Sequence, residues 1–198
     1  KFQLIDMGFY HTGYSRQIIK DKCRRNLAIL EERIGERGEQ PEDYPYLTDV
    51  YMGLEDYEMA VRYARLTLQE ESGLVGMRAK AHRRLIDGLM ALGRDTQERE
   101  QAIDAAMQDM PEIPEFLWDK GHILFERKQY AAAERFLREA LASREKSNRQ
   151  QEECMTNVME AQLPQIYLLL GVISLYKGKQ AEAFESFLHA LEVYPYDD

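Results

Sequence analysis

The sequence predicts an all-α protein, built as an array of about four helical hairpins behind an N-terminal capping helix. Three observations support this prediction. Runs of Ala, Leu, Glu and Arg are broken by Gly, Pro and Asn at intervals suited to short helices joined by tight turns. Segments with the alternating pattern of β-strands are almost absent. Four stretches of the chain also align with one another, which is the signature of a repeat architecture.

The first predicted element is a helix over residues 15–38. Ser15 is suited to cap its first turn, and Gly35 and Gly38 are suited to end it. Its apolar residues recur at intervals of four, four, three and four, which places them on one face: Ile19, Cys23, Leu27, Leu30 and Ile34. We expect this face to cover the first hairpin, because a repeat array must hide the apolar surface at its end.

The four aligned segments are each expected to form a helix, a short polar turn and a second helix. They begin at Tyr46 ("YLTDVYMGLEDYEMAVRYARLTL"), Arg83 ("RRLIDGLMALGRDTQEREQAIDAA"), Trp118 ("WDKGHILFERKQYAAAERFLREAL") and Leu168 ("LLLGVISLYKGKQAEAFESFLHAL"). Small residues recur in the second helices, because helix axes about 8 to 10 Å apart leave no room for a long side chain. They are Ala60, Ala133 and Ala183 early in the second helix and Ala105, Ala140 and Ala190 late in it.

This pattern resembles the tetratricopeptide repeat, a hairpin of about 34 residues whose copies stack into a right-handed superhelix. Tyr57 and Tyr130 match the bulky residue of that family, and Pro195 matches its closing proline. The resemblance implies an array over residues 41–198, with four repeats at residues 41–74, 79–112, 114–147 and 164–197.

Two features depart from the family pattern. The second repeat carries Asp95 and Glu98 where the first carries Tyr57 and Ala60. An excess of residues also precedes the last repeat, in residues 143–162, which we expect to lengthen the neighbouring helices or to form an extra loop.

Composition excludes several classes of protein. A formal net charge of −9 argues against a nucleic-acid-binding surface, which needs clustered Lys and Arg. Cys23 and Cys154 are the only cysteines, so a disulfide framework is excluded and a cytoplasmic location is the natural expectation. The most apolar stretch, residues 163–176, is shorter than the roughly 20 residues of a membrane span.

The opening of the chain, "FYHTGYSRQIIKDKCRRNLAILEE" at residues 9–32, resembles the junction in a group of bacterial family 2 glycosyltransferases. In those proteins a nucleotide-sugar-binding catalytic domain ends in a similar His-Gly-Tyr segment, followed by "RNL" in a helix and then by tetratricopeptide-like repeats. The resemblance implies that residues 1–14 are the tail of a catalytic domain, or a linker, and that the catalytic machinery lies outside this chain. His11 is then either a residue at the edge of an active site or a loop histidine without such a role.

The chain itself carries no motif that supports catalysis. Phosphate-binding glycine loops, the HExxH zinc motif and the Asp-x-Asp metal signature of the glycosyltransferases are all absent. His82, His122 and His189 stand on separate repeats, without neighbouring ligands at helical spacing. We therefore expect this chain not to be an enzyme and to bind no cofactor and no metal.

A protein or peptide is the expected partner, and the first helices of the hairpins are expected to line the groove that binds it. The candidate residues are Asp49, Met52, Arg83, Asp87, Trp118, His122, Phe125 and Leu168. Aromatic and Arg side chains dominate binding hot spots, although Trp118 and Phe125 fit the core between repeats equally well. A clamp for a C-terminal carboxylate is not expected, because Pro45, Asp49, Arg83 and Asp87 occupy the places where such clamps carry Lys, Asn and Arg.

Two classes of function remain open at this point. The chain is either the non-catalytic repeat region of a family 2 glycosyltransferase, positioning a protein acceptor or pairing two subunits, or a stand-alone adaptor that binds a peptide or protein. A purely structural stacking role differs from both by lacking a ligand. Weak self-association is also expected, because the last helix is predicted to expose Phe187, Leu191 and Tyr194. No nucleic acid and no membrane are expected as partners.

Overall fold

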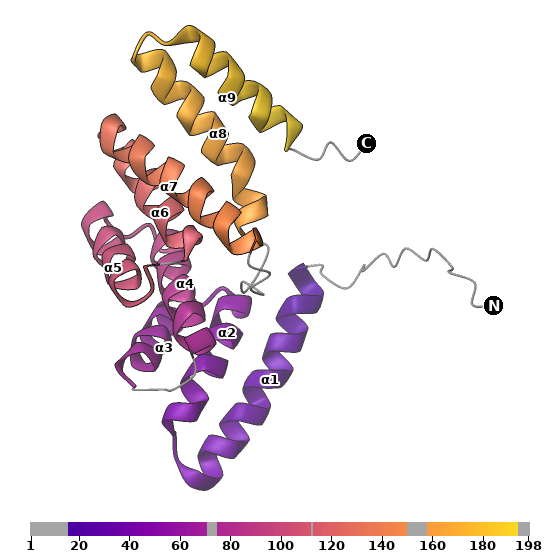
Figure 1. Ribbon diagram of the computed structural model, residues 1–198. Coiled ribbons are helices and arrows are strands. Elements are labelled where there is room, and N and C mark those ends of the chain that lie inside the picture. Colours follow the sequence, from indigo (N-terminus) through magenta and orange to yellow (C-terminus); the bar gives the residue numbers. More distant parts are fainter. Residues whose placement is uncertain (1–15, 71–74, 112, 150–157, 194–198) are drawn as a thin grey trace, which may run out of the picture. The chain divides into compact units, whose positions relative to one another are not determined.

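The computed structural model describes residues 16–70, 75–111, 113–149 and 158–193, and every regular element within these ranges is helical (Figure 1). The elements are α1 (Arg16–Arg37), η1 (Pro41–Asp43), α2 (Tyr44–Leu54), α3 (Tyr57–Gln69), α4 (Val75–Ala91), α5 (Thr96–Asp109), α6 (Pro114–Glu126), α7 (Tyr130–Arg149), α8 (Val158–Tyr176) and α9 (Gln180–Glu192). The predicted all-α class is confirmed.

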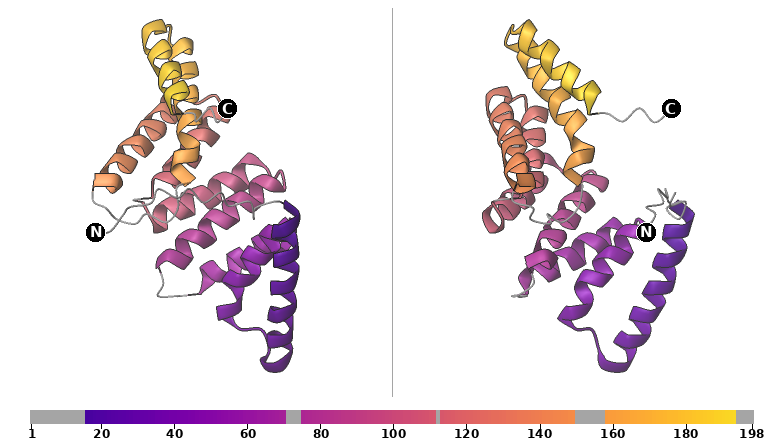
Figure 2. Two further views of the ribbon diagram at one scale, coloured as in Figure 1. Left: turned by 90° about the vertical axis from the view of Figure 1, so that its right-hand side faces the viewer. Right: turned by 45° about the vertical axis from the view of Figure 1, so that its right-hand side comes forward.

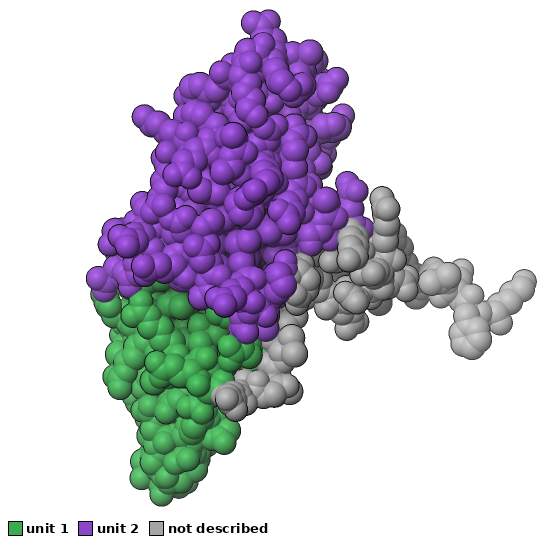
Figure 3. Space-filling model, turned by 60° about the vertical axis from the view of Figure 1, so that its left-hand side comes forward, with its two compact units in different colours: residues 1–93 green, residues 94–198 purple. Residues whose placement is uncertain are grey.

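The chain divides into two compact units, residues 1–93 and residues 94–198 (Figure 3). In the first unit α2 packs against both α1 and α3, and α4 packs against α3. In the second unit α6 pairs with α7 and α8 pairs with α9 as antiparallel hairpins, which can be followed in both views of Figure 2. The helix α5 packs against α6.

The predicted capping helix is α1, and its apolar stripe faces the first hairpin as expected. Leu30 is buried in one cluster with Leu47, Val50 and Tyr63 of α2 and α3. The remaining members of the stripe that pack against this cluster are Cys23, Leu27 and Ile34. Gly38 ends the helix in the left-handed region, with φ at +79°, and its N–H donates to the carbonyl of Ile34 at 2.7 Å.

A buried carboxylate fastens the turn between α1 and α2. Asp43 has no exposed surface and accepts hydrogen bonds from Arg33, from Arg37 at 2.7 Å and from the backbone N–H of Gln40 at 3.1 Å. A charge removed from water is tolerated only when it is paired and hydrogen-bonded. The two arginines of α1 meet this requirement, so they hold the capping helix to the start of the first hairpin.

The predicted small residues do lie where helices cross. Ala60 and Ala133 have no exposed surface, and Ala183 is 1% exposed. Glycines that the sequence analysis did not single out complete two of these crossings. A methyl group on Gly121 would lie 2.7 Å from Leu137 Cδ2, and one on Gly171 would overlap the ring of Phe187. The α6–α7 and α8–α9 hairpins therefore depend on small residues in both helices.

The second predicted repeat differs from the expectation because its turn is one residue longer. A residue with positive φ stands two positions before the second helix in the other three hairpins, at Glu55, Lys128 and Gly178, but Gly93 stands three positions before α5. The helix α5 begins at Thr96, and the carboxylate of Asp95 caps it by accepting from the N–H of Glu98 at 2.8 Å.

This extra residue shifts the register of α5 by one. The late small residue of the repeat is Ala106, which is fully buried, whereas the predicted Ala105 is exposed. The early crossing position, equivalent to Ala60 and Ala133, is occupied by Arg99. In α5 this position is therefore polar, and no small residue stands there.

The residues before the last repeat lengthen both neighbouring helices. Residues 143–149 belong to α7, and residues 158–162 belong to α8. Several residues named from the sequence lie outside the described ranges: His11, Ser15, Cys154, Tyr194 and Pro195, together with the predicted tail at residues 1–14.

Candidate protein-binding site

The first unit carries a pocket between two first helices, α2 and α4. It is lined by Pro45, Tyr46, Thr48, Asp49, Met77, Lys80, Ala81 and Arg84. Its volume is about 70 Å³, whereas clefts that hold a small molecule measure about 300 to 1,000 Å³. The pocket is therefore of a size to receive one side chain of a partner, and too small for a cofactor.

Two cations and one carboxylate set the electrostatics of this pocket. Asp49 of α2 pairs with Lys80 and, at 3.0 Å, with Arg84, both from α4. One negative charge thus faces two positive charges, although the chain as a whole carries a net charge of −9. The side chains of all three residues are 33% to 49% exposed, so the cations are accessible to an incoming anion.

Apolar surface surrounds these charges. Tyr46 is 52% exposed, and the guanidinium of Arg33 lies 6.0 Å from the centre of its ring. The hydroxyl of Thr48 donates to the carbonyl of Tyr44 at 2.8 Å. The polar groups that remain for a partner are therefore chiefly those of Lys80 and Arg84, next to the apolar side chains of Pro45, Tyr46 and Met77.

The predicted groove residues of the first unit are only partly gathered in this pocket. Asp49 lines it, but Met52 is half-buried and lies against Gly88, so it serves packing between α2 and α4. Arg83 and Asp87 pair with each other along α4, at 2.9 Å.

Sequence reasoning missed Lys80 and Arg84 because it chose Arg83 and Asp87 as the groove residues of this helix. Those two residues lie on a neighbouring face of α4 and do not line the pocket. The signal was present in the sequence: Met77, Lys80, Ala81 and Arg84 recur with the spacing of one helix face.

In the second unit the predicted aromatic residues are largely core. Trp118 is 5% exposed, and its ring centre lies 5.2 Å from that of His122. Burial lowers the pKa of His122, and the charge of Glu126 opposes this shift. Phe125 is half-buried against Tyr130, with ring centres 5.5 Å apart. Of the two readings left open for Trp118, the structure favours core packing.

The last predicted groove residue, Leu168 of α8, is 48% exposed. It belongs to a different apolar surface, on the α8–α9 hairpin.

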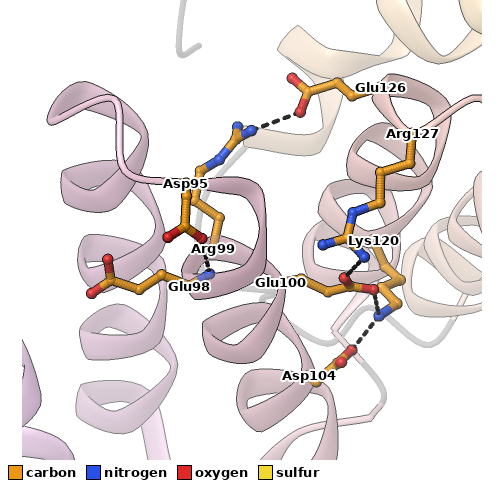
Figure 4. A network of polar contacts seen from close by, with 8 residues as sticks. All are labelled: Asp95, Glu98, Arg99, Glu100, Asp104, Lys120, Glu126 and Arg127. Carbon is orange, nitrogen blue, oxygen red and sulfur yellow. Dashed lines mark hydrogen bonds and ion pairs between the residues drawn. The ribbon is translucent and has the colours of Figure 1, made fainter.

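Charged contacts fasten α5 to α6 (Figure 4). The ammonium of Lys120 lies 2.7 Å from Glu100 and 2.6 Å from Asp104, and Arg127 also pairs with Glu100. Arg99 reaches Glu126 at 2.7 Å. Burial alone would lower the pKa of Lys120, but its hydrogen bonds to Asp104 and Glu100 raise it above the usual value. Because these groups saturate one another, we interpret the network as structural.

Among the described residues no group of three or more His, Cys, Asp and Glu side chains is arranged to hold a metal ion. None of the helices in the described ranges combines the length and the apolar character that crossing a bilayer requires.

Comparisons with known proteins support the repeat assignment. Residues 114–147 and 164–197 match the family model described as "Tetratricopeptide repeat". These two segments cover most of the α6–α7 and α8–α9 hairpins. No curated protein resembles the chain closely enough in sequence to count as a relative.

Solved structures of low sequence identity share the fold. BtubC from P. vanneervenii is 17% identical, with a TM-score of 0.65 over 90% of this chain and 78% of that one. The protein MamA is 13% identical, with a TM-score of 0.63 over 93% of this chain and 95% of that one. PilF from Pseudomonas aeruginosa is 11% identical, with a TM-score of 0.63 over 92% of this chain and 74% of that one. At such identities the likeness concerns the fold alone, and the chain is an all-α array of tetratricopeptide-like hairpins.

Proposed function

We propose that this chain is a protein-interaction module whose α2–α4 pocket receives an acidic side chain from an extended partner segment. Tetratricopeptide repeats support a role as a protein-binding scaffold, and the finer assignment depends on one observation. Lys80 and Arg84 line a small pocket with a single counter-charge, Asp49, and with exposed apolar neighbours. An incoming carboxylate would restore charge balance there and accept hydrogen bonds from both cations.

The neighbouring surface suggests what flanks this acidic residue. Tyr46 and Met77 offer apolar contact at the edge of the pocket. A segment that presents Asp or Glu beside a large apolar side chain therefore fits the surface better than a uniformly acidic one. The pocket volume of about 70 Å³ limits the inserted group to one side chain.

The test is a comparison of two sets of fluorescently labelled peptides in an anisotropy titration. The first set carries Glu between apolar residues, and the second carries Gln at the same place. Because hydrogen bonds to charged groups contribute about 1.5 to 3 kcal/mol, we expect Gln to weaken binding by roughly tenfold or more. The Arg84→Gln and Lys80→Gln variants should lose this preference for Glu.

A matched control is available on α3, where Arg62 is exposed and does not line the pocket. The Arg62→Gln variant makes the same change in net charge and should keep wild-type affinity. Equal binding of both peptide sets, or an effect of Arg62→Gln as large as that of Arg84→Gln, would refute the assignment of the pocket.

The two hypotheses from the sequence share this interaction role and differ in its setting. In the first hypothesis the chain is attached to a family 2 glycosyltransferase, and the array positions a protein acceptor or pairs subunits. This hypothesis rests on the resemblance at residues 9–32, of which residues 9–15 lie outside the described ranges. The stand-alone adaptor needs no such attachment. The coding sequence before Lys1 distinguishes them: an upstream nucleotide-sugar domain with an Asp-x-Asp signature favours the first hypothesis, and a start codon within a few residues favours the second.

A further inference from the structure

The α8–α9 hairpin exposes apolar side chains along both of its helices. On α9, Phe184, Leu188 and Leu191 are 64%, 42% and 55% exposed, and their spacing puts them in one row. On α8, Leu168 and Leu175 are 48% and 51% exposed and also form a row. Phe187, which the sequence analysis expected to be exposed, instead packs inside the hairpin against Gly171.

Both rows lie on the same side of the hairpin. The helix α8 turns Gly171 toward Phe187 of α9, whereas Ile166 and Ile173, both with no exposed surface, lie on another side of α8. Helical spacing places Leu168 and Leu175 on the side of α8 opposite Ile166 and Ile173. The helix α9 runs antiparallel to α8 (Figure 1) and turns Phe187 toward it, so the row of Phe184, Leu188 and Leu191 lies on the same side of the hairpin. We call the surface formed by Leu168, Leu175, Phe184, Leu188 and Leu191 the C-terminal face.

Acidic residues border the C-terminal face. Glu185 and Glu192 lie next to the α9 row, one helical step to its side, and both are exposed. The helix α9 carries three Glu and no Lys or Arg, so its formal charge is −3. Two copies of this face would repel each other if they met directly. A basic amphipathic helix is the better complement.

The chain contains such a helix in α1. On its solvent-facing side Ile18, Lys22, Arg25 and Ile29 follow one another at intervals of four, three and four residues. Ile29 is 58% exposed and Ile18 is 50% exposed. With seven basic and four acidic residues, α1 has a formal charge of +3. We call these four residues the N-terminal row; it lies on the side of α1 away from the Leu30 stripe that covers the first hairpin.

We propose that the C-terminal face of one copy binds the N-terminal row of a second copy, so that the chain self-associates head to tail. The apolar residues of the two surfaces would pack together, while Lys22 and Arg25 would lie beside Glu185 and Glu192. Such a contact is heterologous, because it joins two different surfaces, and a dimer that makes it once keeps one unoccupied surface of each kind. Larger oligomers should therefore follow at higher concentration.

The size of the surfaces sets the strength of this contact. Five side chains, each about half exposed, present on the order of a few hundred Å² of apolar surface, which is the scale of patches that mark interaction sites. Stable interfaces bury about 800 Å² on each partner. We therefore expect weak association, with a Kd of roughly 10 µM to 1 mM, that weakens further as salt screens the charged border.

Sedimentation velocity over this concentration range tests the proposal with two surface variants. Phe184→Ser/Leu191→Ser removes the C-terminal face, and Ile29→Glu removes the N-terminal row. Each variant alone should be monomeric at concentrations where the wild type associates. An equimolar mixture of the two should form a 1:1 dimer and nothing larger. One variant supplies the intact N-terminal row and the other supplies the intact C-terminal face, and no intact surface is left to extend the dimer. All replaced side chains are exposed, and far-ultraviolet circular dichroism checks that the variants fold.

A control and two outcomes make the test decisive. Met90→Glu changes an exposed apolar residue of α4 outside both surfaces and should leave self-association unchanged. A wild-type chain that stays monomeric up to millimolar concentration would overturn the proposal. So would an Ile29→Glu variant that associates as the wild type does, since the C-terminal face would then pair with itself. Neither outcome bears on the α2–α4 pocket, which is tested separately by the peptide titration.

Discussion

Replacing Gly121 with Ala tests whether close packing at the α6–α7 crossing holds this hairpin together. The added methyl group would lie 2.7 Å from Leu137 Cδ2, 2.8 Å from Leu137 Cγ and 3.2 Å from the backbone nitrogen of Leu137. Leu137 itself has no exposed surface, so its side chain has little room to move, and the backbone has less.

The expected magnitude follows from two opposing effects. Overpacking a well-filled crossing costs about 1 to 3 kcal/mol. Ala favours a helix over Gly by about 1 kcal/mol, which offsets part of this cost. We therefore expect Gly121→Ala to lower the free energy of unfolding by about 1 kcal/mol, or roughly 2 to 4 °C in melting temperature.

The matched control is Gly35→Ala in α1, where no atom lies within 4 Å of the added methyl group. With the steric cost absent, this variant should gain stability by up to about 1 kcal/mol. Urea denaturation followed by circular dichroism at 222 nm measures both variants. If Gly121→Ala were as stabilising as Gly35→Ala, the crossing would not be closely packed, and the role assigned to its small residues would be wrong.

Three further predictions concern turns and charges. Lys128→Gly should raise the free energy of unfolding by about 0.5 to 1 kcal/mol in urea denaturation, because Lys128 has φ at +60° and only Gly adopts this region without cost; a loss of stability would contradict this. Asp43→Asn should lower it by about 2 kcal/mol, since the buried carboxylate accepts three hydrogen bonds; a neutral effect would show that the arginines do not need the charge. Hydrogen bonds from Arg16 and Lys20 lower the pKa of Glu55 to about 2. Because the pKa of Glu55 is lower in the folded state than in the unfolded state, the stability that its ionised form contributes is complete above about pH 4.5 and is lost as pH falls toward 2. In Arg16→Gln the midpoint of the NMR titration of Glu55 should move back toward 4.5, and an unchanged midpoint would exclude Arg16 as the cause.

The capping helix shows which structural features the sequence could reveal. Its stripe from Ile19 to Ile34 was readable because apolar residues at helical spacing need burial whatever lies next to them. The buried Asp43 was not readable in the same way. An acidic residue in a turn looks solvated until the fold brings Arg33 and Arg37 over it.

The candidate pocket illustrates a second limit. Asp49 was named from the sequence, but its partners Lys80 and Arg84 were not, since the residues of α4 that face α2 are defined only when the two helices pack together. Successive residues of a helix point about 100° apart, so choosing Arg83 instead of Arg84 selects a neighbouring face. The row of Met77, Lys80, Ala81 and Arg84 is visible as a pattern, but nothing in the sequence ranks it above the row of Arg83 and Asp87.

The helix α5 shows how a repeat array can include a helix that lacks the small-residue pattern. Arg99 of α5 extends to Glu126 of α6, and Lys120 of α6 joins Glu100 and Asp104 of α5. Long charged side chains meet at their tips, so they tolerate a wider spacing of helices than small apolar ones do. A pattern defined by small residues cannot register such a contact, and the family match over residues 114–147 and 164–197 does not extend to α5. Each repeat needs only to satisfy its neighbours, so α5 joins α6 through charged contacts beside its buried residues Ala102, Ile103 and Ala106.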